Sequence, residues 1–288
     1  MEYTELQVTT NFSFLRGASH PEELVEQAAL LGYSEIAITD RNTLAGVVRA
    51  HAAGRIHKVR IIPGCRLDLL DSPSLLVFPK DKEAYAALSN LLTRGNIRTE
   101  KGLCHLYQSD VCEMIRGSCV VMLPEVKLDS NFELADSIRK SAIHYKKVFG
   151  KNLYIGVQRY YQGDDSKYLY RMHELCASLD IPMVATNDVH YHQPERRELQ
   201  DVLTCIREKC TIHTAGYKLH LNAERYLKPA REMQRLFRHY PDAIRRTREI
   251  AEACRFSLDS LKYLYPDEIL TEGRTALEEL EILGLQFY

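Results

Sequence analysis

The chain has 288 residues, of which 45% are hydrophobic and 27% are charged, as in an ordinary folded globular protein. Its formal net charge is −1, so no overall positive field points to a nucleic-acid partner. The N-terminal residues lack the basic and apolar regions of a secretory signal, and no apolar run approaches the roughly 20 residues that span a bilayer.

Short segments rich in β-branched and apolar residues recur along the chain and are predicted to be strands. There are seven of them: TELQVTT (4–10), EIAITD (35–40), VRIIPGCRL (59–67), SLLVFP (74–79), SCVVML (118–123), NLYIGVQ (152–158) and PMVATND (182–188). Most of the gaps between them carry apolar residues at helical spacing, as in residues 21–32, 43–54, 83–95 and 166–179.

Nearly continuous hydrophobic strands that alternate with helices favour a parallel sheet that is covered on both faces. Seven such units predict an α/β fold in which a closed β/α barrel is preferred and an open doubly wound sheet is the alternative. No glycine-rich phosphate loop follows any predicted strand, which disfavours the nucleotide-binding form of the open sheet.

After the last predicted strand the pattern changes to consecutive helices. Residues 194–255 hold 14 Lys or Arg against 9 Asp or Glu. A solvated helical surface is the favoured interpretation of this excess, and a nucleic-acid contact is the alternative. The chain stops within a helical pattern followed by an apolar stub, which is expected of a piece of a longer chain.

The eight cysteines are scattered and form no CxxC pair. This distribution is expected for reduced thiols in a cytoplasmic protein, and it favours neither a disulfide framework nor a zinc site.

In a β/α barrel the functional residues gather where the strands end, because the loops there converge on one mouth. The predicted strand ends supply Gln7, Thr9, Asn11, Asp40, Arg41, Cys65, Arg66, Ser74, Glu125, Gln158, Arg159, Asp188, His190 and His192. A hydrolytic metal cluster needs several imidazoles and carboxylates together, and arginine cannot lose its proton to become a ligand. The mouth therefore holds too few metal ligands for such a cluster.

Three separated segments carry a resemblance to a known family. They are LQVTTNFSFLRGASHPEELVEQAALLGYSEIAITDRNTLAGVVRAH, VRIIPGCRL and PMVATNDVHYHQPERRELQDVLTCIREK. They resemble the N-terminal polymerase-and-histidinol-phosphatase (PHP) domain, and more narrowly that domain in bacterial error-prone C-family DNA polymerases of the translesion branch. The stretch from AREMQRLF to GRTALEELEILG is similar to the same polymerases just before their palm domain, so the resemblance covers essentially the whole chain.

The resemblance implies a distorted seven-stranded β/α barrel in residues 1–193, a group of helices in 194–270 and the start of the connection to a palm domain in 271–288. It implies a parent nucleotidyltransferase that extends a primer during damage-induced mutagenesis and translesion synthesis, with Mg²⁺ held by the palm. The implied partners are the palm, thumb and fingers, DNA, a sliding clamp and accessory mutagenesis proteins. No membrane partner is implied.

The resemblance also assigns positions in the barrel to the family's metal ligands. Asp40, Asp188 and His190 match retained ligand positions. Five positions match lost ligands: Gln7, Thr9, Arg41, Arg66 and Ser74. The ligand of the fifth strand has no clear counterpart. These departures imply a structural domain that needs no cofactor and has no phosphoesterase or exonuclease activity, and a metal-dependent phosphoesterase or exonuclease with an altered ligand set is the alternative.

The two replacing arginines suggest how the site is held together. Arg41 and Arg66 are expected to form ion pairs with Asp40 and Asp188 where metals would otherwise lie, because an unpaired buried charge is costly. Asp40 could equally cap the helix expected near residue 43. With so few partners left, His190 is expected to be hydrogen-bonded to Asp188 or to a backbone carbonyl.

Overall fold

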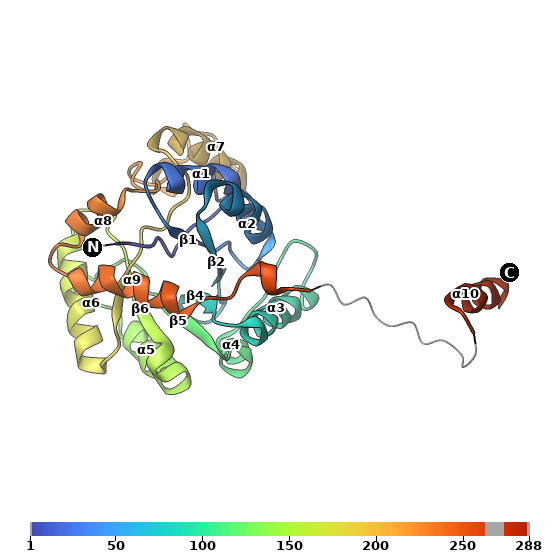
Figure 1. Cartoon of the computed structure of the whole chain (residues 1–288). Helices are drawn as coiled ribbons and strands as arrows, with labels where there is room; N and C mark the ends of the chain where they lie inside the picture. Colours follow the sequence, from blue (N-terminus) through green and yellow to red (C-terminus); the bar gives the residue numbers. More distant parts are fainter. Residues whose placement is uncertain (1, 263–273, 287–288) are drawn as a thin grey trace. The chain divides into compact units, whose positions relative to one another are not determined.

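The computed structural model describes residues 2–262 and 274–286. The chain divides into two compact units, residues 1–258 and 259–288 (Figure 1). In the first unit, the helices that follow residue 194 pack together with the barrel-like core. The second unit contains helix α10 (Ala276–Gln286). The expected boundary between residues 270 and 271 lies outside the described residues.

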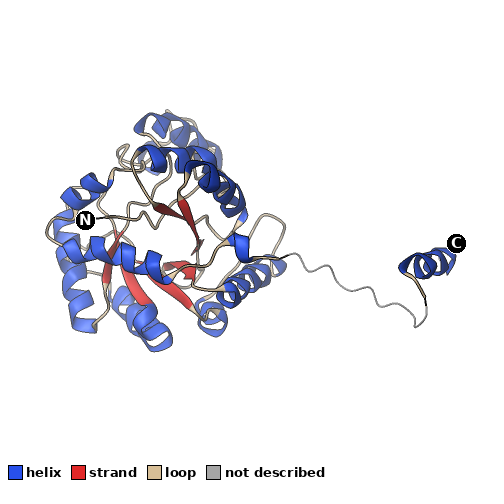
Figure 2. Ribbon diagram, in the orientation of Figure 1, coloured by secondary structure: helices blue, strands red, loops and turns tan. Residues whose placement is uncertain are grey.

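The described strands form two sheets. Strand β1 (Glu35–Ile38) pairs in parallel with β2 (Arg60–Pro63). The second sheet has the order β3-β4-β5-β6-β7, with bounds Cys65–Leu67, Ser74–Pro79, Ser118–Leu123, Leu153–Val157 and Met183–Ala185 (Figure 2). The α/β class is confirmed, but a closed seven-stranded barrel is not, since the described strands do not form one continuous sheet.

The predicted first strand near the N-terminus is an irregular extended segment between the two sheets. Its backbone bonds to Ala37 and Thr39 on one side and to Val189 on the other. The acceptors for Ala37 and Thr39 are Glu5 and Val8, so a step of three residues along the segment faces a step of two residues along β1 and the residue that follows it. This is the spacing of a β-bulge, which interrupts a regular ladder. The segment therefore bonds to both sheets but is not itself a regular strand.

Strand β4 runs opposite to its neighbours. It pairs antiparallel with both β3 and β5, whereas β5, β6 and β7 are mutually parallel. The prediction of an all-parallel sheet is thus wrong at this strand. Only residues 68–73 connect β3 to β4, and a parallel crossover needs a dozen residues or more. Because β4 is reversed, its first residue, Ser74, lies at the same end of the fold as the last residues of the other strands.

Helices surround the strands (Figure 1). Those of the first unit are α1 (Pro21–Leu30), α2 (Ala45–His57), α3 (Lys82–Ile97), α4 (Gln108–Met114), α5 (Asp136–Phe149), α6 (Asp165–Leu179), α7 (Arg197–Arg207), α8 (Ala230–Leu236) and α9 (Pro241–Ala253). None of the helices in the described part of the chain is long and apolar enough to cross a membrane.

One end of the barrel-like core is closed by α9 and the residues that follow it. The core's inner apolar cluster gathers side chains from the strands and from α9, among them Leu6, Ile62, Phe78, Val121, Val184, Ile250 and Cys254. Arg60, at the start of β2, donates to the carbonyls of Ala251 and Cys254 at 2.7 and 2.9 Å. The opposite end, where β1, β2, β5, β6 and β7 finish, is the open mouth.

Candidate functional site

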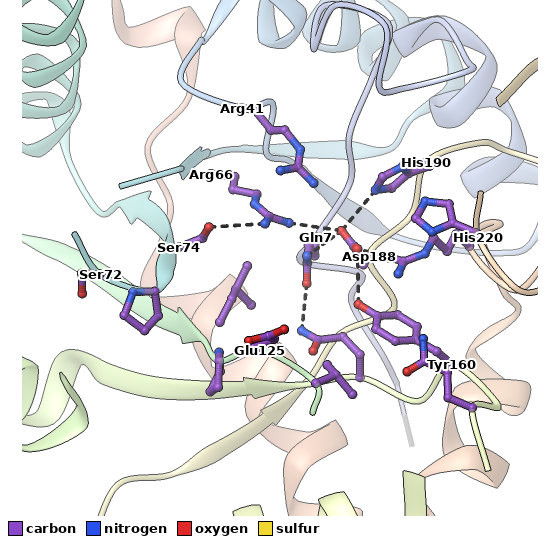
Figure 3. A pocket seen from close by; sticks show the side chains of 17 residues that line it. Gln7, Arg41, Arg66, Ser72, Ser74, Glu125, Tyr160, Asp188, His190 and His220 are labelled. Atoms are coloured by element: carbon purple, nitrogen blue, oxygen red, sulfur yellow. Dashed lines mark hydrogen bonds and ion pairs between the residues drawn. The ribbon is translucent and has the colours of Figure 1, made fainter. Parts of the chain in front are cut away.

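The mouth contains a cavity of about 520 Å³ (Figure 3). Its polar wall includes Gln7, Arg41, Arg66, Ser74, Gln158, Tyr160, Asp188, His190, His220 and Arg225. Its other lining residues include Pro73, Leu123, Pro124, Glu125 and Val126. The cavity therefore lies at the strand ends, where a β/α fold is expected to place its functional residues.

Asp188 is the buried centre of the polar wall, with 5% of its surface exposed. Its Oδ1 accepts a hydrogen bond from Gln7 Nε2 at 2.6 Å and lies 3.6 Å from Arg66 Nη1. Its Oδ2 pairs with the Arg225 guanidinium and accepts from the Tyr160 hydroxyl at 3.3 Å. Both carboxylate oxygens are thus engaged by side chains of this chain.

Tyr160 and Arg225 also pack on each other. The Arg225 guanidinium carbon lies 4.0 Å from the centre of the Tyr160 ring, within the range of a cation–π contact. Burial would raise the pKa of Asp188, but Arg225 first, and then His190 and Arg66, hold this pKa well below its ordinary value. The carboxylate is therefore ionised at neutral pH and is part of a buried charge network.

A second carboxylate in the network, Asp68, was not predicted from the sequence. Arg41 Nη1 lies 2.8 Å from Asp68 Oδ2, and Arg66 Nε lies 2.8 Å from Asp68 Oδ1. The Ser74 hydroxyl also donates to Oδ1 at 2.7 Å. Burial raises the pKa of Asp68, but Arg66 and Arg41 outweigh it and lower the pKa far below its ordinary value. The two replacing arginines therefore share this carboxylate.

Asp40 has a different role from the one predicted. Its carboxylate accepts from the Thr10 amide and hydroxyl, each at 2.8 Å, and from the Ser13 hydroxyl at 2.6 Å. It forms no ion pair with Arg41 or Arg66 in the described structure, and it is not among the residues that line the cavity. The predicted pairing of Asp40 with an arginine is wrong, whereas Arg66 does lie beside Asp188.

Asp40 does not cap α2 either, because the residue before that helix is Leu44 and no side chain caps it. It instead fastens the loop that follows the first segment. Burial raises the pKa of Asp40. The hydrogen bonds from Ser13 and Thr10 lower this pKa, but they offset only part of the effect of burial.

Gly46 lies directly against this carboxylate. A Cβ atom at residue 46 would overlap with Asp40 Oδ2 and lie 2.8 Å from Thr10 Oγ1. Because both groups are buried and hydrogen-bonded, Gly46→Ala is expected to lower the free energy of unfolding by about 1–3 kcal/mol. Urea unfolding measures the loss, with the exposed neighbour Ala45→Ser as control. Equal stability of the two variants would contradict the tight contact.

His190 is buried beside Asp188, with 4% of its surface exposed. Its Nε2 lies 3.4 Å from Asp188 Oδ1, but within the described chain neither ring nitrogen makes a hydrogen bond of acceptable geometry. The ring meets His220 edge to face at 5.4 Å between centres. Burial lowers the pKa of His190 to about 4 and that of His220 to about 3, so both are neutral at pH 7.

Of the other predicted residues, Gln7 lies at this centre, whereas Thr9 and His192 do not line the cavity. Gln7 accepts from Gln158 and Thr186 at 3.1 and 2.8 Å, which fixes the amide that holds Asp188. Thr9 is buried, is not among the residues lining the cavity, and its hydroxyl finds no partner among the residues described. His192 lies outside the cavity and is bonded to Ser19 at 2.7 Å.

The donor set of the cavity does not fit the divalent metals that the resemblance would imply. In residues 2–262 and 274–286 no three His, Cys, Asp or Glu side chains converge as metal ligands would. The cavity instead presents three guanidiniums, which cannot coordinate and which repel a divalent cation.

The basic excess in residues 194–255 is largely matched by acids of the same chain. Ion pairs are formed by Arg196, Arg197, Arg207, Arg225, Lys228, Arg235, Arg245 and Arg248. The pairs of Arg225 and Lys228 lie within the fold, whereas the exposed pairs of Arg235 with Glu232 and of Arg245 with Glu249 support the interpretation of the helices as a solvated surface.

Known proteins resemble this chain in sequence and in fold. The PHP domain family matches residues 5–160. Error-prone DNA polymerases of Caulobacter vibrioides and Rhodopseudomonas palustris are each 46% identical to this chain, over 96% and 98% of its length. The chain spans about a quarter of the length of these relatives, 25% in both cases.

Among solved structures, an amidohydrolase from Chromobacterium violaceum superposes with a TM-score of 0.50 at 13% identity. The superposition covers 66% of this chain and 88% of the amidohydrolase, and it supports the fold alone. The match over residues 5–160 covers more than half of the sequence, and the chain belongs to the PHP domain family.

Proposed function

We propose that this chain is the PHP domain of an error-prone C-family DNA polymerase that acts in damage-induced mutagenesis and translesion synthesis. The identity to two such polymerases over nearly the whole chain supports this assignment. The parent enzyme would be a cytoplasmic nucleotidyltransferase that adds deoxynucleotides to a primer. Its Mg²⁺ and catalytic carboxylates would belong to the palm domain, outside this sequence. Its palm, thumb and fingers, DNA, a sliding clamp and accessory mutagenesis proteins are the proposed partners.

Within that enzyme, the domain is proposed to be a structural and interaction module without a metal or a hydrolytic activity of its own. This proposal rests on the side chains that engage both carboxylate oxygens of Asp188. Its Oδ2 is paired with Arg225, and its Oδ1 faces Gln7 and Arg66. A metal at this carboxylate would have to displace a buried guanidinium and leave it unpaired, which is strongly unfavourable. The cations of the chain therefore take the electrostatic role of the metals.

Metal analysis combined with an activity assay tests this proposal. The purified chain is dialysed with Zn²⁺ or Mn²⁺, freed of unbound metal and analysed by mass spectrometry, and hydrolysis of p-nitrophenyl phosphate is then followed. We expect much less than one metal per chain and no hydrolysis above that of Asp188→Ala. Stoichiometric metal together with turnover that Asp188→Ala abolishes would establish the alternative, a phosphoesterase with an altered ligand set.

A further inference from the structure

A row of guanidiniums continues from the cavity onto the rim of the mouth. Arg16 is half-buried, and burial, followed by its neighbours Arg41 and Arg207, lowers its pKa to about 10. Arg207 Nη1 donates to the carbonyl of Leu15 at 2.8 Å, so the end of α7 is fastened to the loop that carries Arg16. Arg41 in turn shares Asp68 with Arg66. The row therefore runs from α7 through the loop to the cavity.

Arg16 differs from the other members of this row. Arg41, Arg66 and Arg207 each form an ion pair with a carboxylate. For Arg16 the described structure contains no side-chain hydrogen bond or ion pair. The positive charges of Arg41 and Arg207 outweigh the opposing effect of the Asp68 carboxylate on its pKa. A partly desolvated cation with cationic neighbours and no paired anion is stabilised when an external anion binds. The rim therefore favours the binding of an anion.

Phe14 lies two residues before Arg16 on the same loop and is 82% exposed. The loop is held in place, because Ser13 is bonded to Asp40 and the amide of Asn11 donates to the carbonyl of Ser19. Gly17 packs so closely on Thr10 that a Cβ atom there would overlap with the Thr10 carbonyl. The aromatic ring is therefore presented to solvent by a fixed backbone.

We infer that this rim binds single-stranded nucleic acid. A strand supplies the two chemical groups that the rim lacks, phosphates for the guanidiniums and an unpaired base to stack on Phe14. Base stacking on an exposed aromatic needs no particular sequence, so binding is expected to be nonspecific. Duplex DNA offers the phosphates but no free base face, and an acidic peptide offers charge without a stacking base. Each of these should bind more weakly.

This inference goes beyond the proposed function. Neither the relation to polymerases nor a cavity without metal assigns a nucleic-acid surface to this domain. The surface centres on the loop of residues 11–17 and takes only Arg207 from the helices of residues 194–255, where the charge excess in the sequence would place it.

Fluorescence anisotropy with a labelled dT12 oligonucleotide in EDTA tests the inference on the full chain. Nonspecific affinity is expected near the micromolar range at low salt. Phe14→Ala should weaken binding about tenfold with little change in salt dependence, and Phe14→Trp should restore it. Arg16→Gln should reduce the slope of log affinity against log salt by about 0.7, the value for one single-strand phosphate.

Two matched variants serve as controls. Ile97→Ala removes another exposed apolar side chain, on α3, and Arg139→Gln removes a cation of α5 for which no ion pair is found among the described residues. Both should bind dT12 like the original chain, and thermal unfolding should confirm that all variants are folded. The inference is overturned if dT12 does not bind in 50 mM salt, if Phe14→Ala binds unchanged, or if poly-glutamate competes as well as unlabelled dT12. In a parallel titration with Mn²⁺ in place of EDTA, binding seen only with Mn²⁺ would instead contradict the proposed function.

Discussion

Replacement of Asp188 by alanine is expected to lower the free energy of unfolding by about 3–5 kcal/mol, the usual cost of breaking a buried ion pair. The loss arises mainly at Arg225, whose side chain is 13% exposed and whose ion pair is with Asp188. Without the carboxylate, this guanidinium stays buried with its cation–π contact to Tyr160 and no counter-charge. Urea unfolding at pH 7 followed by circular dichroism measures the change.

The stabilisation that Asp188 provides is also expected to depend on pH. Because the folded-state pKa of Asp188 is depressed, its stabilisation is fully present above the ordinary carboxyl range and is lost as pH falls below it. Arg245→Ala provides the control, since Arg245 forms exposed ion pairs with Asp242 and Glu249 that are worth about 0–1 kcal/mol. If Asp188→Ala cost no more than this control, the buried network would not contribute to stability.

Part of this network could be predicted from the sequence. Asp188 and Arg66 follow from one rule, that the ends of barrel strands meet at one mouth. Asp68 obeys the same rule, since it comes directly after β3, and an inspection of acids just beyond each strand would have found it. The error at Asp40 has another cause. Both loop anchors and site residues follow strands, and spacing alone does not separate them.

Arg225 could not be predicted from any local pattern. It lies between α7 and α8 in a stretch without helical or strand periodicity. It reaches the site because the His190 amide donates to the Arg225 carbonyl at 2.8 Å, and because Tyr191 and Tyr226 form a parallel bridge. Such pairing between irregular segments depends on the finished fold. Residues that enter a site from the chain beyond the last strand are therefore the ones that sequence reasoning misses.

The direction of the strands was also only partly predictable from the sequence. Hydrophobic patterns identified the segments of β1 and of β4 to β7, but the single strand predicted over residues 59–67 divides into β2 and β3 of different sheets. Hydrophobicity also says nothing about strand direction. The short connection of residues 68–73 contained the missing information, since six residues allow a hairpin and no crossover helix. The bulge in the first segment was hidden for a different reason. It arises from hydrogen bonding to β1, which no property of residues 4–10 alone reveals.

Glu5→Gln is expected to make the chain relatively more stable as pH rises. Glu5 is 1% exposed and accepts hydrogen bonds from the Tyr3 hydroxyl at 2.7 Å and from the amides of Gln7 and Asn187 at 2.9 and 3.2 Å. Burial raises its pKa from 4.5 to about 7. The folded state therefore holds a proton that the unfolded state has released between these two values. Ionisation of Glu5 thus costs stability as pH rises through this interval.

The expected cost is about 3 kcal/mol between pH 4.5 and pH 8, because one pKa unit corresponds to roughly 1.4 kcal/mol. A glutamine keeps its carbonyl oxygen for the two amides and can donate its NH₂ to the Tyr3 oxygen, so the variant retains the contacts without the charge. Urea unfolding of both proteins at pH 5, 6, 7 and 8 gives the difference directly. Glu83, an exposed residue of α3, provides the matched control. The difference in the free energy of unfolding between Glu83→Gln and the original chain should stay nearly constant over this pH range. All three proteins contain His190 and His220, so the titration of these histidines cancels in the comparison. If the free energies of unfolding of Glu5→Gln and the original chain changed in parallel with pH, Glu5 would be ionised in the folded state and the prediction would be wrong.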